Sequence, residues 1–173
     1  MKRRRLAIIV IAALALCGAS EPVLVPEVSQ RDIQIKYGFT GAEILLFGAI
    51  VYPGGRAPDG QSDIIVVLKG PVQSIVLREK EKIAGIWVNA ASTEFRSAPS
   101  YYAIASSRPI KEIVDDRTAA IYELGLDYLQ LSPVGSIEPE EQRRFVAGLT
   151  DLNRRQGLYL EREDSVQILE SVL

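Results

Sequence analysis

Residues 63–79 decide the fold class, and they read DIIVVLKGPVQSIVLRE. The run 63–69 is rich in β-branched residues and is bounded by charges, which predicts a β-strand. Gly70 and Pro71 then form a turn signal. Beyond the turn, Ile75 and Leu77 recur at every second position, as in a half-buried strand. The stretch therefore predicts two consecutive strands joined by a turn.

Further strand signals lie on both sides of this stretch. Alternating apolar residues predict a strand at 33–37, and the unbroken apolar run 44–51 predicts a central strand covered on both faces. Other strands are expected at 86–88, 93–95, 101–105, 158–160 and 166–169. Because most of these strands follow one another with only turn residues between them, an Ig-like β-sandwich is favoured over alternating βα units.

The segment 109–157 carries helix signals instead. Asp115 or Asp116 is expected to cap a short helix, because a carboxylate accepts the free N–H groups of a first turn. Gly125 is expected to close that helix, since glycine readily adopts the left-handed conformation found at helix ends. The overall prediction is a β-rich α+β fold, namely an Ig-like β-sandwich with a helical insertion around 109–157.

A longer helix is expected between Pro139 and Arg155. Proline suits the first turn, two glutamates follow it at the positive end of the helix, and two arginines lie at the negative end. Three apolar residues recur within this span at helical spacing: Phe145, Leu149 and Leu152. These side chains are predicted to form the buried stripe of the helix.

The N-terminus has the pattern of an export signal. Four basic residues, Lys2 to Arg5, precede the unbroken apolar run from Leu6 to Leu16. As a helix this run is about 16 Å long at about 1.5 Å per residue, whereas a hydrocarbon core is about 30 Å thick. The run is too short to span a membrane comfortably, so a cleaved signal helix is favoured.

Three outcomes are open for this leader. The small residues Gly18, Ala19 and Ser20 suit a signal peptidase that cuts after Ser20 or one residue earlier. Retention of the helix as an uncleaved anchor is the second outcome. Lipidation of Cys17 is the third, but the large Leu16 before it disfavours a lipoprotein signal.

Beyond the signal peptide (1–20), the chain is expected to comprise an extended, proline-containing linker at 21–30 and one β-rich domain at 31–173. Removal of the signal peptide takes away four of the 20 basic residues and none of the 22 acidic ones, so the exported part is acidic. A nucleic-acid partner is therefore not expected, because phosphate contacts need a positive surface. The length suffices for one hydrophobic core without disulfides.

Composition also limits the chemistry. The chain has no histidine and a single cysteine, Cys17. His-assisted nucleophiles and zinc or iron sites are thereby disfavoured, so no metal or other cofactor is expected. The sequence also lacks the signatures of phosphate-binding loops and dinucleotide folds. A non-enzymatic role is favoured, and carboxylate chemistry is the enzymatic alternative.

The best candidate for a binding surface is an aromatic and polar cluster. Tyr101 and Tyr102 are followed by two serines and by Arg108, whose guanidinium can bind an anion or a carboxylate. Trp87, beside Asn89, is a second candidate as an aromatic platform. The predicted binding residues are therefore Trp87, Tyr101, Tyr102 and Arg108, and no catalytic residue is assigned.

Three strings of the sequence resemble a known family. They are FTGAEILLFG at 39–48, AGIWVN at 84–89 and YYAIASSRP at 101–109. They are similar to the Alph_Pro_TM family of exported proteobacterial proteins, a transmembrane family for which no activity or cofactor is established. Its members continue through further strands to a C-terminal membrane helix, so the resemblance implies that this chain is a shortened or incomplete member.

The resemblance and the leader together indicate a function. We expect an exported protein, periplasmic or anchored to the inner membrane facing the periplasm, that acts as an interaction module for an envelope or membrane protein. Membrane contact would come from a retained signal helix or from the family's C-terminal helix. The alternative is a carboxylate-dependent periplasmic hydrolase that acts on glycans through two acidic residues about 5 to 9 Å apart.

Overall fold

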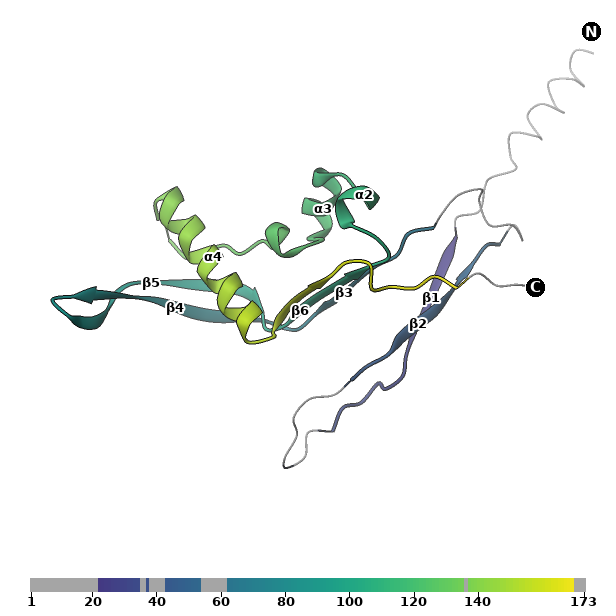
Figure 1. The fold of residues 1–173 in the computed structure, drawn as a ribbon, viewed down its shortest axis with the longest axis horizontal. Coiled ribbons are helices and arrows are strands. Elements are labelled where there is room, and N and C mark those ends of the chain that lie inside the picture. Colours follow the sequence, from purple (N-terminus) through teal and green to yellow (C-terminus); the bar gives the residue numbers. More distant parts are fainter. Residues whose placement is uncertain (1–21, 35–36, 38–42, 54–61, 136, 170–173) are drawn as a thin grey trace, which may run out of the picture. The chain divides into compact units, whose positions relative to one another are not determined.

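The computed structural model describes residues 22–34, 37, 43–53, 62–135 and 137–169 (Figure 1). The chain divides into two compact units, residues 1–60 and 61–173. The elements in chain order are β1 (Val23–Val28), β2 (Leu46–Val51), β3 (Ile65–Lys69), β4 (Val72–Ile83), β5 (Ile86–Pro99), β6 (Tyr102–Ser106), α2 (Ile110–Ile113), α3 (Asp116–Tyr122), the 3-10 helix η1 (Leu126–Tyr128), α4 (Pro139–Arg155) and β7 (Tyr159–Arg162). Strands and helices in these proportions confirm the predicted β-rich α+β class, whereas an Ig-like sandwich stays a prediction.

In the first unit, β1 and β2 form an antiparallel pair that runs from Val23 opposite Val51 to Val28 opposite Leu46. The sequence predicts an extended linker at 21–30. Within that range Val23–Val28 form the strand β1, which is paired with β2 rather than free. Of the strand predicted at 33–37, residues 35 and 36 lie outside the described part of the chain, and residues 33–34 form no strand.

The side chains of β2 are largely exposed. Phe47 is 55% exposed, although the apolar run 44–51 predicts a strand covered on both faces. The difference arises because β2 has one partner strand, and no helix covers it, within the described residues of its unit. Gly48 has a local role in this pair, since a Cβ at that position would lie 2.6 Å from the carbonyl oxygen of Val25.

The second unit contains a sheet in the strand order β3–β6–β7. β3 runs antiparallel to β6, and β6 runs parallel to β7 with Tyr102 opposite Tyr159. Parallel neighbours need a long crossover, and the segment from α2 to α4 supplies it, so the helical insertion lies where it is predicted. The strand predicted at 166–169 does not form; the backbone after β7 instead donates two N–H groups to the carbonyl oxygen of Ser106.

β4 and β5 form a long antiparallel hairpin in the same unit (Figure 1). The sequence predicts two short strands at 86–88 and 93–95, whereas β5 is continuous through both. The hairpin changes register between them, because Glu79 faces Ala91 while the next residue of β4 faces Asn89. A bulge of this kind inserts one extra residue, here Ala90, without ending the strand.

The core of the second unit joins α4 to the strands. Phe95 and Tyr102 are fully buried, and Tyr159 is 1% exposed. The rings of Tyr102 and Tyr159 meet edge to face, with their centroids 6.3 Å apart. α4 adds Phe145 and Leu149 to this cluster.

α4 begins and ends where the sequence predicts, but its buried stripe differs by one position. Phe145, Leu149 and Asn153 are buried, whereas Leu152 is 42% exposed. Residues four apart lie on one line of a helix, so Asn153 continues the line of the other two. Its amide side chain hydrogen-bonds Tyr159, which explains a polar residue in the core.

α3 has the predicted cap at its start and an unpredicted residue at its end. The side chain of Asp115 accepts a first-turn backbone N–H at 2.9 Å. The left-handed residue that ends the helix is Glu123, with φ of 52°, and not Gly125. The Glu123 carboxylate accepts the backbone N–H of Gln130 and pairs with Lys69, contacts that hold a non-glycine residue in this conformation.

Candidate functional site

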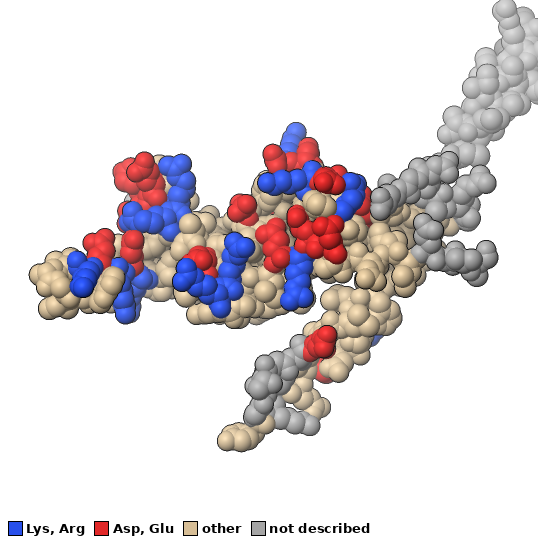
Figure 2. Space-filling model, viewed as in Figure 1, with Lys and Arg blue, Asp and Glu red and all other residues tan. Residues whose placement is uncertain are grey.

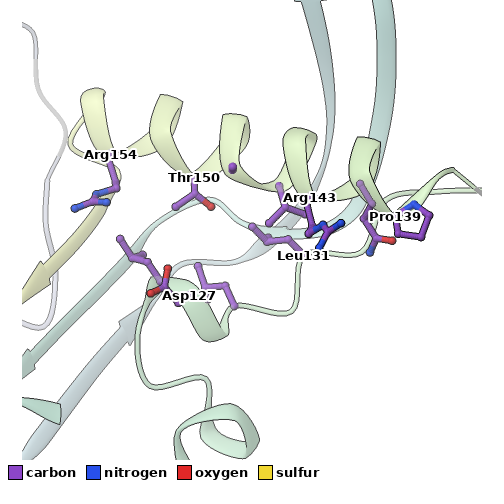
Figure 3. A pocket seen from close by; sticks show the side chains of 11 residues that line it. Asp127, Leu131, Pro139, Arg143, Thr150 and Arg154 are labelled. Carbon is purple, nitrogen blue, oxygen red and sulfur yellow. The ribbon is translucent and has the colours of Figure 1, made fainter. Parts of the chain in front are cut away.

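A groove runs along α4 in the second unit (Figure 3). Its volume is about 720 Å³. One wall is α4, and the other is η1 together with the segment that follows it. The lining residues are Leu126, Asp127, Leu129, Leu131, Pro139, Gln142, Arg143, Val146, Ala147, Thr150 and Arg154.

The spacing of residues on α4 explains why the groove forms. Gln142, Val146 and Thr150 recur every fourth position, so they share one side of the helix. Ala147 between them is small and leaves space that a larger side chain would fill. The wall opposite α4 contributes three leucines, each less than 10% exposed. They form the apolar part of the groove surface, called the apolar floor below: Leu126, Leu129 and Leu131.

Charged side chains stand at both ends of the apolar floor. Arg143 and Arg154 project from α4 on either side of Thr150, and Asp127 lies on the opposite wall (Figure 3). The helix separates the two arginines by about 16 Å at about 1.5 Å per residue. A groove with an apolar floor and a cation at each end suits an extended apolar segment that carries a carboxylate.

The described lining residues do not support glycan hydrolysis. Asp127 is the one carboxylate among them, whereas that reaction needs two carboxylates that flank the same bond. Nor does any group of three or more potential metal ligands come together in the part of the chain that the structure describes.

Glu161 on β7 interacts electrostatically with two lining residues, Asp127 and Arg154. Glu161 as a whole is exposed, but neighbouring protein displaces enough water from its carboxyl to raise the pKa above its usual range, and the negative charges of Asp127 and Glu163 raise it further. A hydrogen bond from the backbone of Leu126 and the charge of Arg154 act in the opposite direction. The folded protein thus holds the proton of Glu161 more tightly than the unfolded chain does.

Glu161→Gln should therefore stabilise the protein at neutral pH but not in acid. The ionised carboxylate begins to destabilise the fold as the pH rises above its ordinary pKa of 4.5, and the variant lacks that charge. Thermal melts should show a gain in Tm that is absent near about pH 4, grows as the pH rises from the ordinary pKa to the raised pKa of the folded state, and is constant above it. A pH-independent gain for Glu161→Gln would contradict the assignment.

The structure separates the predicted binding residues. Trp87 is 64% exposed, close to the turn between β4 and β5. Tyr101 lies just beyond Pro99, at the opposite end of β5. At about 3.3 Å per residue, the strand places these two aromatic residues about 40 Å apart. Trp87 therefore belongs to a different surface from Tyr101 and Arg108.

Tyr102 lies in the core rather than at a surface. Its side chain is fully buried, and its hydroxyl donates to the carbonyl oxygen of Glu123 at 2.6 Å. The same hydroxyl accepts the backbone N–H of Gly125 at 2.9 Å. Burial raises the pKa of the Tyr102 phenol. These contacts connect β6 to the end of α3, which is a structural role.

Arg108 is bound by carboxylates of its own chain. Its Nε and one Nη donate to the two oxygens of Asp63 at 2.7 and 2.6 Å, and Glu112 lies 3.6 Å from the other Nη. The Arg108 guanidinium holds the pKa of the Asp63 carboxyl below its usual range. This pair ties the residues before β3 to those after β6.

The other predicted site residues, Gly18, Ala19 and Ser20 at the signal cleavage region, lie outside the described residues. The groove itself is not predicted from the sequence. Its helical wall has a signal in the repeat of Gln142, Val146 and Thr150, but the facing leucines belong to an irregular segment. The residues that connect the two walls show no periodicity in the sequence, so the sequence does not predict that these walls face each other.

A family model described as "Putative transmembrane protein (Alph_Pro_TM)" matches residues 23–173. The match agrees with the family that the sequence strings resemble. Neither the curated proteins nor the solved structures contain a match to the chain. In the described part of the chain, no helix combines the length and the apolar character that crossing a membrane requires.

Proposed function

Since the chain belongs to the Alph_Pro_TM family, we propose that it is an exported, membrane-associated interaction module that is accessory to an envelope or transporter assembly. The module works on the periplasmic side of the inner membrane, either free or anchored there. Its groove along α4 receives an extended segment of a partner protein.

The leader supports export. Positive residues from Lys2 to Arg5 stay on the cytoplasmic side of a bilayer, and the apolar run Leu6–Leu16 enters it. Small residues follow directly and suit cleavage. The body that follows has no cysteine and is held together by its core, so transfer to an oxidising compartment requires no disulfide chemistry.

The groove is the observation that carries the interaction role. Its leucine floor offers apolar contact area, and the guanidinium groups of Arg143 and Arg154 can bind a carboxylate of the partner at either end. Recognition grooves for peptide segments combine an apolar surface with a few polar groups that fix the orientation.

Photo-crosslinking in cells tests the groove. A photoreactive residue at Ala147, in the groove, should capture one defined envelope protein, which mass spectrometry identifies. The same residue at Asp151, which is exposed and outside the groove lining, is the matched control. With the identified partner purified, Ala147→Trp should weaken binding about tenfold or more, because it fills the groove, while Asp151→Trp should not.

Two results would contradict this function. Equal crosslinking from the two positions, or unchanged affinity of Ala147→Trp, would remove the groove from the interaction. The same cells report on export through the mass of the N-terminus, which distinguishes cleavage after Ala19 or Ser20, retention of the leader, and lipidation of Cys17. Recovery of leader-bearing protein dissolved in the cytosol would contradict export.

A further inference from the structure

The hairpin of β4 and β5 extends well beyond the core. Its proximal half packs there through Leu77 and Phe95, and Arg144 of α4 contacts Glu79 at 3.1 Å. Beyond that ion pair, every residue from Lys80 to Ala90 is exposed. The distal half of the hairpin is therefore a free surface.

Three large apolar side chains are exposed at the end of this hairpin. Ile83 is 55% exposed, Ile86 68% and Trp87 64%. Ala84 and Gly85 connect the strands with φ of 49° and 88°, the backbone of a tight two-residue turn. The turn holds Ile83 directly opposite Ile86, so the apolar group is built into a defined scaffold. Ile83 and Ile86 thus share one face of the ribbon, and Trp87, the next residue of β5, lies on the other face.

The pairing of the strands places Trp87 on the face that carries the cations of the hairpin. Trp87 pairs with Lys82, and Asn89 pairs with Lys80. Paired residues share a face of a two-stranded ribbon, and so do residues two apart on one strand. Lys82, Lys80 and Arg78 therefore follow one another on the face of Trp87.

The acidic residues of β4 lie on the opposite face. Glu79 and Glu81 alternate with the cations, and Arg144 already engages Glu79. Figure 2 shows the uncharged end of the hairpin with charged side chains directly behind it. One face of the hairpin thus combines an exposed indole with a row of three positive charges: Arg78, Lys80 and Lys82.

We infer that the end of the β4–β5 hairpin binds the surface of an anionic phospholipid bilayer. Trp87 enters the interfacial region, where an indole places its ring among the acyl ends and its N–H among the headgroups. Lys80 and Lys82 keep their ammonium groups at the level of the lipid phosphates while their apolar stems follow the ring. This inference deepens the membrane association in the proposed function and does not depend on the groove.

Charge complementarity favours a lipid surface as the occupant. A row of cations without a carboxylate on the same face, between Arg78 and the turn, matches a sheet of phosphates. Because the lysines alternate with glutamates along β4, a flat anionic surface can approach from the face of Trp87 without meeting Glu79 or Glu81.

Trp87 is the single tryptophan of the chain, so its fluorescence reports on the hairpin alone. Vesicles of phosphatidylcholine and phosphatidylglycerol, added to the purified full-length chain, should shift its emission to shorter wavelength. Lipids brominated near the headgroup should quench it. Vesicles of phosphatidylcholine alone should have much less effect, and high salt should reverse most of the shift.

Lys80→Gln/Lys82→Gln should weaken the response to anionic vesicles about 30-fold, which corresponds to about 2 kcal/mol at about 1.4 kcal/mol per factor of ten. Glu81→Gln, on the opposite face of the same strand, should not weaken it. Thermal melts of both variants should match the wild type, since all three side chains are exposed.

Three results would overturn the inference. They are an unchanged Trp87 emission while the protein sediments with anionic vesicles, an equal response to vesicles without phosphatidylglycerol, and a response that appears only when a protein partner is added. The last result would assign the hairpin to a protein instead. Crosslinking at Ala147 tests the groove independently of the hairpin. A negative vesicle assay therefore does not contradict the proposed function, and a negative crosslinking result does not contradict lipid binding by the hairpin.

Discussion

Leu149→Ala in α4 is expected to lower the free energy of unfolding by about 2–5 kcal/mol. The Leu149 side chain is 1% exposed and lies in the core cluster with Phe145 and Tyr159. Truncation removes buried methyl groups and leaves a cavity that the close-packed neighbours fill only in part. Urea unfolding followed by circular dichroism measures the change.

Leu152→Ala is the matched control on the same helix. Leu152 is 42% exposed, so the same truncation is expected to cost less than about 1 kcal/mol. The pair of variants tests which line of residues on α4 faces the core. Equal losses of unfolding free energy, or a larger loss for Leu152→Ala, would show that α4 does not turn the line of Leu149 toward the core.

Tyr102→Ala is expected to cost about 3–5 kcal/mol, as for other large aromatic side chains in cores. Its ring is fully buried against Tyr159, and its hydroxyl serves two backbone groups at the end of α3. Tyr102→Phe keeps the ring and removes only the hydroxyl, so it measures the contribution of the hydroxyl alone. It should cost about 1–3 kcal/mol, because the Glu123 carbonyl and the Gly125 N–H lose their partner. The same unfolding experiment compares the two variants.

Tyr101→Phe serves as the control for the hydroxyl. Tyr101 is adjacent in sequence but only half-buried, so the loss of its hydroxyl should change the free energy of unfolding by less than about 0.5 kcal/mol. If Tyr102→Phe proves equally mild, the bridge from β6 to α3 contributes nothing to stability and the core role of this hydroxyl is wrong.

Much of the fold could be predicted because its signals are local. The β-branched run at 63–69 contains β3, and Pro139 with its two glutamates marks the start of α4. Asp115 caps α3 through its own first turn. Strand composition, helix caps and turn residues act within a few positions, so a single sequence reveals them.

The features that the sequence did not predict have a different cause: they depend on pairing and packing between residues that are distant in the chain. β1 is a strand because the residues 46–51 pair with it, and nothing in its own proline-containing sequence requires that. β5 runs through the small residues at 89–92 because β4 supplies a partner along the whole length. Asn153 is buried in place of Leu152 because it continues the line of Phe145 and Leu149 on α4, and there the Tyr159 hydroxyl accepts a hydrogen bond from its side chain.

The candidate site was harder to predict for the same reason. The sequence predicts separate short strands at 86–88 and 93–95, whereas the single continuous β5 places Trp87 and Tyr101 near its opposite ends. The groove combines α4 with an irregular segment before it. The sequence pattern of neither element predicts that the other lies opposite it. Composition did limit the chemistry, because a chain without histidine and with one cysteine offers few catalytic side chains.

The parallel pairing of β6 with β7 also sets an order of assembly. Tyr102 pairs with Tyr159, so the entire crossover must leave the ribosome before that side of β6 meets its neighbour. The β4–β5 hairpin can close much earlier, because its two strands are adjacent in the chain. The nascent polypeptide therefore passes through a stage with an open strand edge, and a holdase that shields this edge should reduce aggregation during synthesis.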